Sequence, residues 1–171
     1  MPDRGFALEQ YRLRAGVYDN ELAMFEPLRR EAVAGLRLSP GATVLDVGCG
    51  TGLSFPLLAE AVGPRGRIVG IEQCPEMLVK ARERLASVGP CEVSLINAPV
   101  ESARWAGQAD AVLFHFTHDV LQCPEAIANV LTFVRNSWGH AAGAVTPETV
   151  ARMRTMTASR EEPWNDADLA E

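Results

Sequence analysis

The sequence lacks the features that mark several common classes of protein. No apolar stretch in its 171 residues reaches the roughly 18 to 20 residues that a membrane-spanning helix needs. The first residues, Met-Pro-Asp-Arg-Gly-Phe, contain no apolar core of the kind found in a secretory signal peptide. Internal repeats and low-complexity segments are absent as well. These absences predict one globular domain with no membrane span and a cytoplasmic location.

Basic side chains are scarce. The chain has 16 lysines and arginines against 22 aspartates and glutamates, which gives a net charge of −6 and an isoelectric point near 5.1. Proteins that bind nucleic acids are usually basic on at least one face. The charge balance therefore predicts no nucleic-acid partner.

Paired cysteines are also missing. None of the four cysteines, Cys49, Cys74, Cys91 and Cys123, has the Cys-x-x-Cys spacing of a zinc site. A disulfide framework is not expected in a chain of this size without a secretion signal. We therefore expect no metal site and reduced, mostly buried thiols. Cys49 lies within a glycine-rich turn, so its alkylation is expected to block a ligand bound there.

The sequence does contain an alternation of apolar strands and amphipathic helices. The expected strands are Thr43–Val47, Arg67–Glu72, Cys91–Ile96 and Ala109–Phe116. Helices are expected over Leu53–Val62, from Pro75, from Pro124 and within residues 1–40. This alternation predicts an α/β fold with a doubly wound parallel sheet. Ligands of such sheets bind beyond the carboxyl ends of the strands, where the strand order reverses.

The most informative motif lies at the end of the first expected strand. Residues 44–52 read Val-Leu-Asp-Val-Gly-Cys-Gly-Thr-Gly, so Asp46 is followed by Gly48, Gly50 and Gly52. Glycine permits positive φ angles and lets a ligand approach the backbone closely, and the helix start beyond it offers unpaired N–H groups. This set suits a ligand with hydroxyl, amino and carboxylate groups. The alternative is a glycine-rich turn without a ligand.

Two nucleotide-binding motifs fit this turn poorly. The dinucleotide motif G-x-G-x-x-G needs a small residue at position 53, which is Leu53, and the P-loop needs Gly-Lys followed by Ser or Thr. The observed Asp-x-Gly-x-Gly-x-Gly resembles the first motif of the class I S-adenosylmethionine-dependent methyltransferases, of the small-molecule type. The resemblance covers about residues 40–135. An oxidoreductase that uses NAD stays as an alternative, disfavoured by Leu53.

The resemblance implies a Rossmann-like methyltransferase core that binds S-adenosyl-L-methionine and releases S-adenosyl-L-homocysteine. The acceptor would attack the sulfonium methyl group in line, with the protein supplying proximity, alignment and exclusion of water. The acidic composition favours a small metabolite, a quinone or a lipid-like acceptor over a polymer. The Asn-Pro-Pro-Tyr-type sequence of many methyltransferases that act on nucleic-acid amino groups is absent, which argues against base methylation.

Side chains at the other strand ends complete the expected cofactor site. Glu72 ends the second strand, where a carboxylate can accept both ribose hydroxyls of a nucleoside; an ordinary polar strand end is the alternative. Asn97 and Ala98 follow the third strand, where members of the family often have an acid that accepts the adenine amino group, while the next backbone N–H meets the ring. Asn97 departs from that pattern, although its carbonyl can still accept. Gln73 and Met77 are expected to flank the same pocket, Met77 being half core and half adenine wall.

Asp46 and the glycine turn are expected at the methionine end of the cofactor. Asp46 would hold the amino group directly or through water, or would orient the turn by accepting from its backbone N–H groups. The backbone of Gly48, Cys49, Gly50 and Gly52 would lie against the ligand.

The end of the fourth strand carries the expected chemistry. It reads Phe-His-Phe-Thr-His-Asp, and in the family this edge faces both the methyl donor and the acceptor. His115 is expected beside the cofactor, and His118 is the candidate general base, because a histidine pKa near 6.5 suits that task. A structural histidine at 115 and a loop cap formed by His118 and Asp119 are the alternatives. A base is needed only if the acceptor must lose a proton.

Three segments are expected in the chain. Residues 1–40 form an N-terminal helical lid, because Tyr11, Tyr18 and Asp19 resemble a Tyr-Asp segment that folds over the cofactor in small-molecule members of the family. An amphipathic helix packed on the sheet is the alternative. Residues 41–146 form the cofactor-binding core, and residues 147–171 form a short helix and a tail whose last eleven residues hold five acids and no base.

The resemblance ends after Arg135. Residues 136–171 contain one weak strand candidate, Ala141–Val145, and no sequence for the antiparallel hairpin that closes the family fold. The Pro-Gly-Gly-like turn before the fifth strand is missing too. The sheet is therefore expected to be shortened at its C-terminal end, with an exposed edge through which two copies can form a homodimer. The alternative function is a non-catalytic cofactor-binding or partner subunit with an incomplete acceptor site.

Overall fold

A computed structural model of the chain describes residues 4–117, 120, 123–135 and 141–159. Four parallel strands in the order β3-β2-β1-β4 form its sheet. They are β1 (Thr43–Val47), β2 (Arg67–Glu72), β3 (Glu92–Asn97) and β4 (Ala111–Phe114). Because the chain adds strands first on one side of β1 and then on the other, the strand order reverses between β1 and β4. A doubly wound sheet binds its ligands beside such a reversal.

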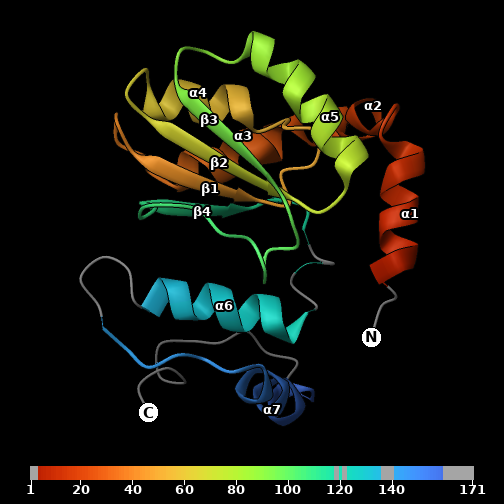
Figure 1. Cartoon of the computed structure of the whole chain (residues 1–171), viewed down its shortest axis with the longest axis vertical. Coiled ribbons are helices and arrows are strands. Elements are labelled where there is room, and N and C mark those ends of the chain that lie inside the picture. Colours follow the sequence, from red (N-terminus) through yellow and green to blue (C-terminus); the bar gives the residue numbers. More distant parts are fainter. Residues whose placement is uncertain (1–3, 118–119, 121–122, 136–140, 160–171) are drawn as a thin grey trace.

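Helices cover both faces of this sheet (Figure 1). The segments before and between the first three strands are α1 (Arg4–Arg14), α2 (Tyr18–Leu22), a short 3₁₀ helix (Ala23–Phe25), α3 (Glu26–Gly35), α4 (Phe55–Val62) and α5 (Pro75–Arg84), which continues as a 3₁₀ turn (Leu85–Ser87). The helices after β4 are α6 (Pro124–Arg135) and α7 (Pro147–Thr157). The doubly wound α/β fold predicted from the sequence is confirmed.

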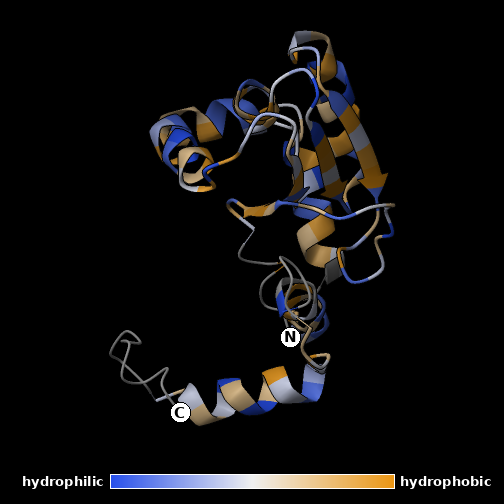
Figure 2. Cartoon of the chain, turned by 90° about the vertical axis from the view of Figure 1, so that its left-hand side faces the viewer, coloured by the Kyte–Doolittle hydropathy of each residue, from blue (hydrophilic) through white to orange (hydrophobic). Residues whose placement is uncertain are grey.

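Strand residues alternate between two apolar cores. Val44 and Ile68 face one side, where Phe55, Leu58 and Val62 of α4 are fully buried. Leu45 and Val47, paired in register with Val69 and Ile71, face the other side. Because both faces are covered, the strands are apolar at nearly every position, as parallel strands usually are; Figure 2 shows the strands as hydrophobic ribbons.

The strand bounds show where local sequence decides the structure. β1 and β2 have the predicted limits, and β3 is shifted by one residue. β4 is shorter than predicted: Asp110 precedes it and accepts from the Thr43 N–H through Oδ2 at 2.8 Å, and Phe116 beyond it adopts a positive φ of 57°. A positive φ cannot continue a strand, so β4 ends before this residue.

Two other expectations change. α4 begins at Phe55 rather than Leu53, because a turn closed by the Gly52 N–H donating to the Cys49 carbonyl at 2.9 Å occupies the preceding residues. The strand predicted at Ala141–Val145 is wrong. That segment is irregular, and the Val145 N–H donates instead to the Thr132 hydroxyl of α6 at 2.8 Å.

The C-terminal helix lies outside the two cores. Thr146 caps α7 by accepting from the Thr149 N–H at 3.2 Å. α7 packs against α6 on the side away from the sheet (Figures 1 and 2). Within the residues that the structure describes, every helix is too short or too polar to cross a membrane.

Candidate functional site

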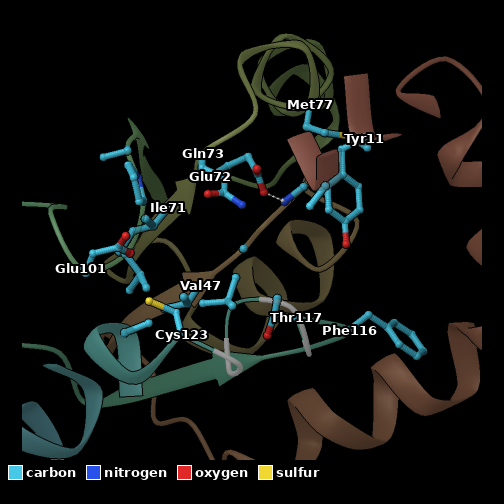
Figure 3. A pocket seen from close by; sticks show the side chains of 18 of the residues that line it. Tyr11, Val47, Ile71, Glu72, Gln73, Met77, Glu101, Phe116, Thr117 and Cys123 are labelled. Atoms are coloured by element: carbon cyan, nitrogen blue, oxygen red, sulfur yellow. Dashed lines mark hydrogen bonds between the residues drawn. The ribbon is translucent and has the colours of Figure 1, made fainter. Parts of the chain in front are cut away.

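A cavity of about 330 Å³ lies at the carboxyl ends of β1 and β2 (Figure 3). Its walls come from these strand ends, the loop after β3, the segment after β4, the start of α6 and the N-terminal helices. The lining residues are Ala7, Tyr11, Tyr18, Val47, Gly48, Gly50, Ile71, Glu72, Gln73, Met77, Ala98, Pro99, Val100, Glu101, Phe116, Thr117, Val120, Cys123, Pro124, Glu125 and Ala126. The cavity thus occupies the edge that the strand order predicts for a ligand.

The glycine turn is folded back onto the end of β2. The N–H groups of Gly48 and Cys49 both donate to the Ile71 carbonyl, at 2.8 and 3.1 Å. The Gly50 N–H donates to Oε2 of Glu72 at 3.0 Å. Gly48 and Gly50 have φ angles of +68° and +56°, a region that favours glycine. The two glycines therefore bring bare backbone to the cavity wall, and β2 holds the turn in place.

Glu72 is fixed between two backbone donors. Its other oxygen, Oε1, accepts from the Cys74 N–H at 2.7 Å, and the side chain is 8% exposed. Each carboxylate oxygen can accept more than one hydrogen bond. Glu72 lines the cavity from the strand end predicted for it.

Asp46 lies beneath the turn and is 2% exposed. Its Oδ2 atom is buried and has no hydrogen-bond partner among the described residues. Burial, and then the nearby Glu72 carboxylate, raise the pKa of Asp46 to about 7, against the lowering effect of the Arg29 guanidinium. Asp46 is not part of the cavity lining. The hydrogen bonds that orient the turn go to Ile71 and Glu72, so the turn-orienting role considered for Asp46 belongs to those two residues.

Two predicted residues of the turn serve the core instead of the cavity. A Cβ atom on Gly52 would lie 2.6 Å from the Phe55 ring, so this glycine allows α4 to pack closely. Cys49 is 8% exposed and belongs to the core cluster, and its sulfur would lie 3.0 Å from a Cβ on Gly70. Burial raises the pKa of the Cys49 thiol well above its usual range, which disfavours the reactive thiolate. Alkylation at Cys49 is therefore disfavoured, and the expectation that it blocks a ligand stays a prediction.

The end of β3 is tied to β2 by its own polar groups. The Asn97 side-chain amide donates to the carbonyls of Glu72 and Gln73, at 2.9 and 3.1 Å. The Ala98 N–H, which the family resemblance assigned to an adenine ring, donates to the Glu72 carbonyl at 3.2 Å. Ala98, Gln73 and Met77 line the cavity, whereas Asn97 does not. Ala98 thus contributes a wall rather than a donor, and Asn97 fixes the loop.

The segment after β4 places its residues differently from the prediction. His115 is half-buried next to the Phe116 ring, with ring centroids 4.3 Å apart, and it is not part of the cavity lining. Burial, and then the Arg29 guanidinium, lower the pKa of His115. Phe116 lines the cavity and contacts the Phe25 ring at 5.1 Å. The expected cofactor contact of His115 therefore has no support from the cavity lining and stays a prediction. His118 and Asp119 lie outside the described residues.

The N-terminal helices cover one side of the cavity. Tyr11 and Tyr18 both line it, and their rings make an edge contact at 6.1 Å. Asp19 follows Tyr18 and accepts from the Thr51 hydroxyl at 2.5 Å and from the Arg84 guanidinium. The α1 helix packs against α5 rather than on the sheet. This segment therefore lines one side of the cavity, and Asp19 joins it to the glycine turn. Its role as a lid stays a prediction.

The wall opposite Tyr11 and Tyr18 is not predicted from the sequence. Val100 and Glu101 come from the loop after β3, and Cys123 and Glu125 come from the start of α6. The Cys123 thiol donates to Glu125 at 3.0 Å, and burial together with this carboxylate raises the thiol pKa. The strand-end rule points to the loop after β3, but no motif marks the start of α6 as a wall. No group of three or more potential metal ligands occurs in the described part of the chain.

Comparison with known proteins agrees with this geometry. A family model described as a methyltransferase domain matches residues 44–137. Carboxy-S-adenosyl-L-methionine synthase of Trichodesmium erythraeum is 31% identical over 116 residues, which are 64% of this chain and 46% of that protein. Malonyl-acyl-carrier protein O-methyltransferase of Anoxybacillus flavithermus is 27% identical over 139 residues, which are 81% of this chain and 52% of that protein. The chain therefore spans about half the length of these two relatives.

A solved structure shares the fold. The crystal structure of a SAM-dependent methyltransferase from Aquifex aeolicus matches with a TM-score of 0.60 and 20% sequence identity, over 86% of each chain. This match confirms that the sheet and its helices form a Rossmann-like methyltransferase fold.

Proposed function

Because this chain belongs to the family of methyltransferase domains, we propose that it binds S-adenosyl-L-methionine in the cavity beside Glu72 and transfers the methyl group to a small molecule. The position of Glu72 carries the proposal. This carboxylate lines the cavity while it accepts from the Gly50 N–H at 3.0 Å, so one side chain joins the glycine turn to the ligand space.

The residues present fit the proposed cofactor. Glu72 would accept hydrogen bonds from ribose hydroxyls, and the apolar side chains of Ile71 and Met77 offer a wall for a flat ring. The Asp46 Oδ2 atom, buried and without a partner among the described residues, fits a ligand ammonium group that reaches it through the turn. A bound S-adenosylmethionine supplies an already activated methyl group. The protein would therefore hold the two reactants, align the acceptor with the methyl group and exclude water from the site.

The N-terminal segment would exclude water from this site. We propose that residues 1–40 act as a lid on a cofactor-binding core of residues 41–146. The rings of Tyr11 and Tyr18 at the cavity wall support this division, and so does the bridge from Asp19 to Thr51 and Arg84. A closed lid keeps water from the reacting groups and strengthens the electrostatic interactions inside.

The charge of the chain supports a small acceptor. Its net charge of −6 disfavours a nucleic acid, and the cavity of about 330 Å³ has the size of a small-molecule site. Incubation with radiolabelled S-adenosylmethionine and separate small-molecule, protein and RNA fractions of a cell extract would test this point. We expect label in the small-molecule fraction; label only in protein or RNA would contradict the acceptor class and leave the cofactor assignment intact.

Calorimetric titration with S-adenosylhomocysteine tests the cofactor directly. We expect saturable one-to-one binding that Asp46→Ala and Glu72→Ala weaken. Glu60→Gln, an exposed carboxylate on the outer side of α4, is the matched control and should bind like the parent. Absence of binding by the folded parent would overturn the proposal.

A second candidate function is non-catalytic cofactor binding. The described lining of the cavity includes carboxylates but no histidine or lysine side chain that could act as a base. A binding subunit would hold S-adenosylmethionine unchanged during long incubation with the small-molecule fraction, whereas an enzyme would release S-adenosylhomocysteine.

We also propose that two copies associate through β4. This strand is the edge of the four-stranded sheet in the described part of the chain, and an edge strand offers N–H and C=O groups for pairing. Sedimentation equilibrium should then show a dimer. Ala111→Pro should yield the monomer, because the Asp110 N–H donates to Thr43 of β1 and the next N–H along β4, that of Ala111, faces the free edge. A monomeric parent would overturn this assembly.

A further inference from the structure

A second cavity, of about 500 Å³, lies under the sheet. Its upper wall is the face that carries Leu45 of β1 and Val112 of β4, which are register partners. Its lower wall is α6, which contributes Val130, and Trp105 closes one side. Figure 1 shows α6 on the side of the sheet opposite α4 and α5.

The second cavity adjoins the candidate cofactor site. Four residues line both spaces, namely Val47, Ile71, Val100 and Glu101. Val47 and Ile71 stand at the ends of β1 and β2, directly before the glycine turn and Glu72. Figure 3 shows Glu101 on the side of the first cavity opposite Tyr11. A molecule that fills the second cavity would therefore lie against the wall that the two cavities share, away from the lid.

Most of the side chains that line the second cavity are apolar, and Glu101 and Arg104 are its charged members. Leu45, Val47 and Ile71 present side chains that are at most 3% exposed. The polar groups on α6 already have partners: Asn129 donates to the Glu101 carbonyl at 3.0 Å, and the Thr132 hydroxyl accepts from the Val145 N–H at 2.8 Å. A peptide segment would bring one N–H and one C=O per residue into this space without enough partners. A hydrocarbon framework has no such polar groups and needs no hydrogen-bond partners there.

We infer that the second cavity holds the apolar body of the methyl acceptor, an aromatic or long-chain hydrocarbon compound with one nucleophilic group at the shared wall. This assignment rests on the proposed function, since it deepens the same site. The body would gain affinity from the buried sheet face, and the Glu101 carboxylate at the junction would accept a hydrogen bond from a hydroxyl or amino group. The lid and the acceptor body would then lie at opposite ends of the joined cavities.

The test uses the full chain and 2-naphthol, a planar apolar alcohol, as the probe. Val130→Trp fills the second cavity from α6, and Leu131→Trp, on the exposed side of the same helix, is the matched control. We expect saturable 2-naphthol binding by the parent, at least about tenfold weaker binding by the Val130 variant, and a change within about twofold for the Leu131 variant. If the Val130 variant does not fold, Val112→Phe narrows the same cavity from the strand side.

Titration with S-adenosylhomocysteine separates this inference from the proposed function. Both helix variants should keep the parent affinity for S-adenosylhomocysteine, and the two ligands should bind together. No 2-naphthol binding by the parent, equal binding by the cavity-filling variant, or competition between the two ligands would each overturn the inference. Loss of S-adenosylhomocysteine binding by the folded parent would instead overturn the proposed function.

Discussion

The Gly50 backbone N–H donates to the Glu72 carboxylate across 3.0 Å, and this bond joins the turn after β1 to the end of β2. The two residues are 22 positions apart in the chain, and the strand pairing of Val47 with Ile71 brings them together. One carboxylate therefore shapes the turn and lines the cavity. A change at Glu72 acts on both the fold of the turn and the ligand.

We predict that Glu72→Gln weakens S-adenosylhomocysteine binding by about tenfold or more, since hydrogen bonds to charged groups contribute about 1.5–3 kcal/mol. The amide can accept through only one of its two ends, so the Gly50 or the Cys74 N–H loses its acceptor, and the melting temperature should also fall by a few degrees. Calorimetry and thermal unfolding measure the two effects. Glu60→Gln controls for loss of charge, and affinity within about twofold of the parent in the Glu72 variant would contradict the role.

The bridge from Asp19 predicts a kinetic effect. Asp19→Asn weakens the pairing with Arg84 that holds α2 over the glycine turn. Since Asp19 is 44% exposed, the loss should be modest, with S-adenosylhomocysteine dissociating about three to ten times faster, corresponding to roughly 1 kcal/mol. Stopped-flow displacement measures the rate.

Glu21→Gln supplies the control for Asp19. Glu21 is in the same short helix and pairs with Arg14 at the surface, so its variant removes an ion pair without touching the turn. Equal dissociation rates in the two variants would show that the Asp19 bridge does not hold the lid.

Asp46 predicts a pH dependence of stability. Burial raises its pKa to about 7, so the folded state holds a proton that the unfolded state releases near its ordinary pKa of about 3.9. Stability from this group is complete below about pH 4 and is lost as the pH rises to about 7, by up to about 4 kcal/mol. Urea unfolding at about pH 5 and about pH 8 should show a smaller decline in Asp46→Asn, whose amide does not titrate. Parallel declines in parent and variant would contradict the buried proton.

The sequence predicts β1 and β2 well because their limits are local. Pro40-Gly41 and the glycine turn bound β1, and Glu72 ends an apolar run. The end of β4 could not be predicted, since the positive φ of Phe116 depends on its packing against Phe25. The 141–145 segment has strand-like composition, but Thr132 of α6 satisfies its Val145 N–H, a contact that no local pattern reveals.

The residues of the candidate site also fall into those that local sequence predicts and those that it does not. Gly48, Gly50 and Glu72 were predicted because a motif and a strand end determine their positions, and all three line the cavity. Cys49 and Gly52 belong to the same motif, but Cys49 is buried in the core and Gly52 lies against the Phe55 ring, and the motif alone does not reveal these contacts. Cys123 and Glu125 line the cavity only because α6 begins beneath the sheet, and the path of the chain after β4 determines that position.

Gly48 offers a test of how closely the turn approaches the segment after β4. Its φ is +68°, and a Cβ atom there would lie 2.4 Å from the Thr117 Cγ2 methyl group. We predict that Gly48→Ala lowers the free energy of unfolding by about 2–5 kcal/mol, because the left-handed conformation costs about 1–2 kcal/mol and the overpacking a further 1–3 kcal/mol. S-adenosylhomocysteine binding should fall as well, since both Gly48 and Thr117 line the cavity.

Gly63 separates strain from overpacking. Its φ of +67° matches that of Gly48, but no atom lies within 4 Å of a Cβ built there. The ψ of Gly63 is −174°, a region that only glycine adopts readily, so Gly63→Ala should cost the conformational part alone, about 1–3 kcal/mol, and leave ligand binding unchanged. Thr117→Ser removes the clashing methyl group, so the Gly48→Ala, Thr117→Ser double variant should recover stability toward that of Gly63→Ala. Urea unfolding of the parent, the two alanine variants and the double variant measures the differences in the free energy of unfolding. Equal losses for Gly48→Ala and Gly63→Ala would show that the turn moves enough to avoid the contact with Thr117.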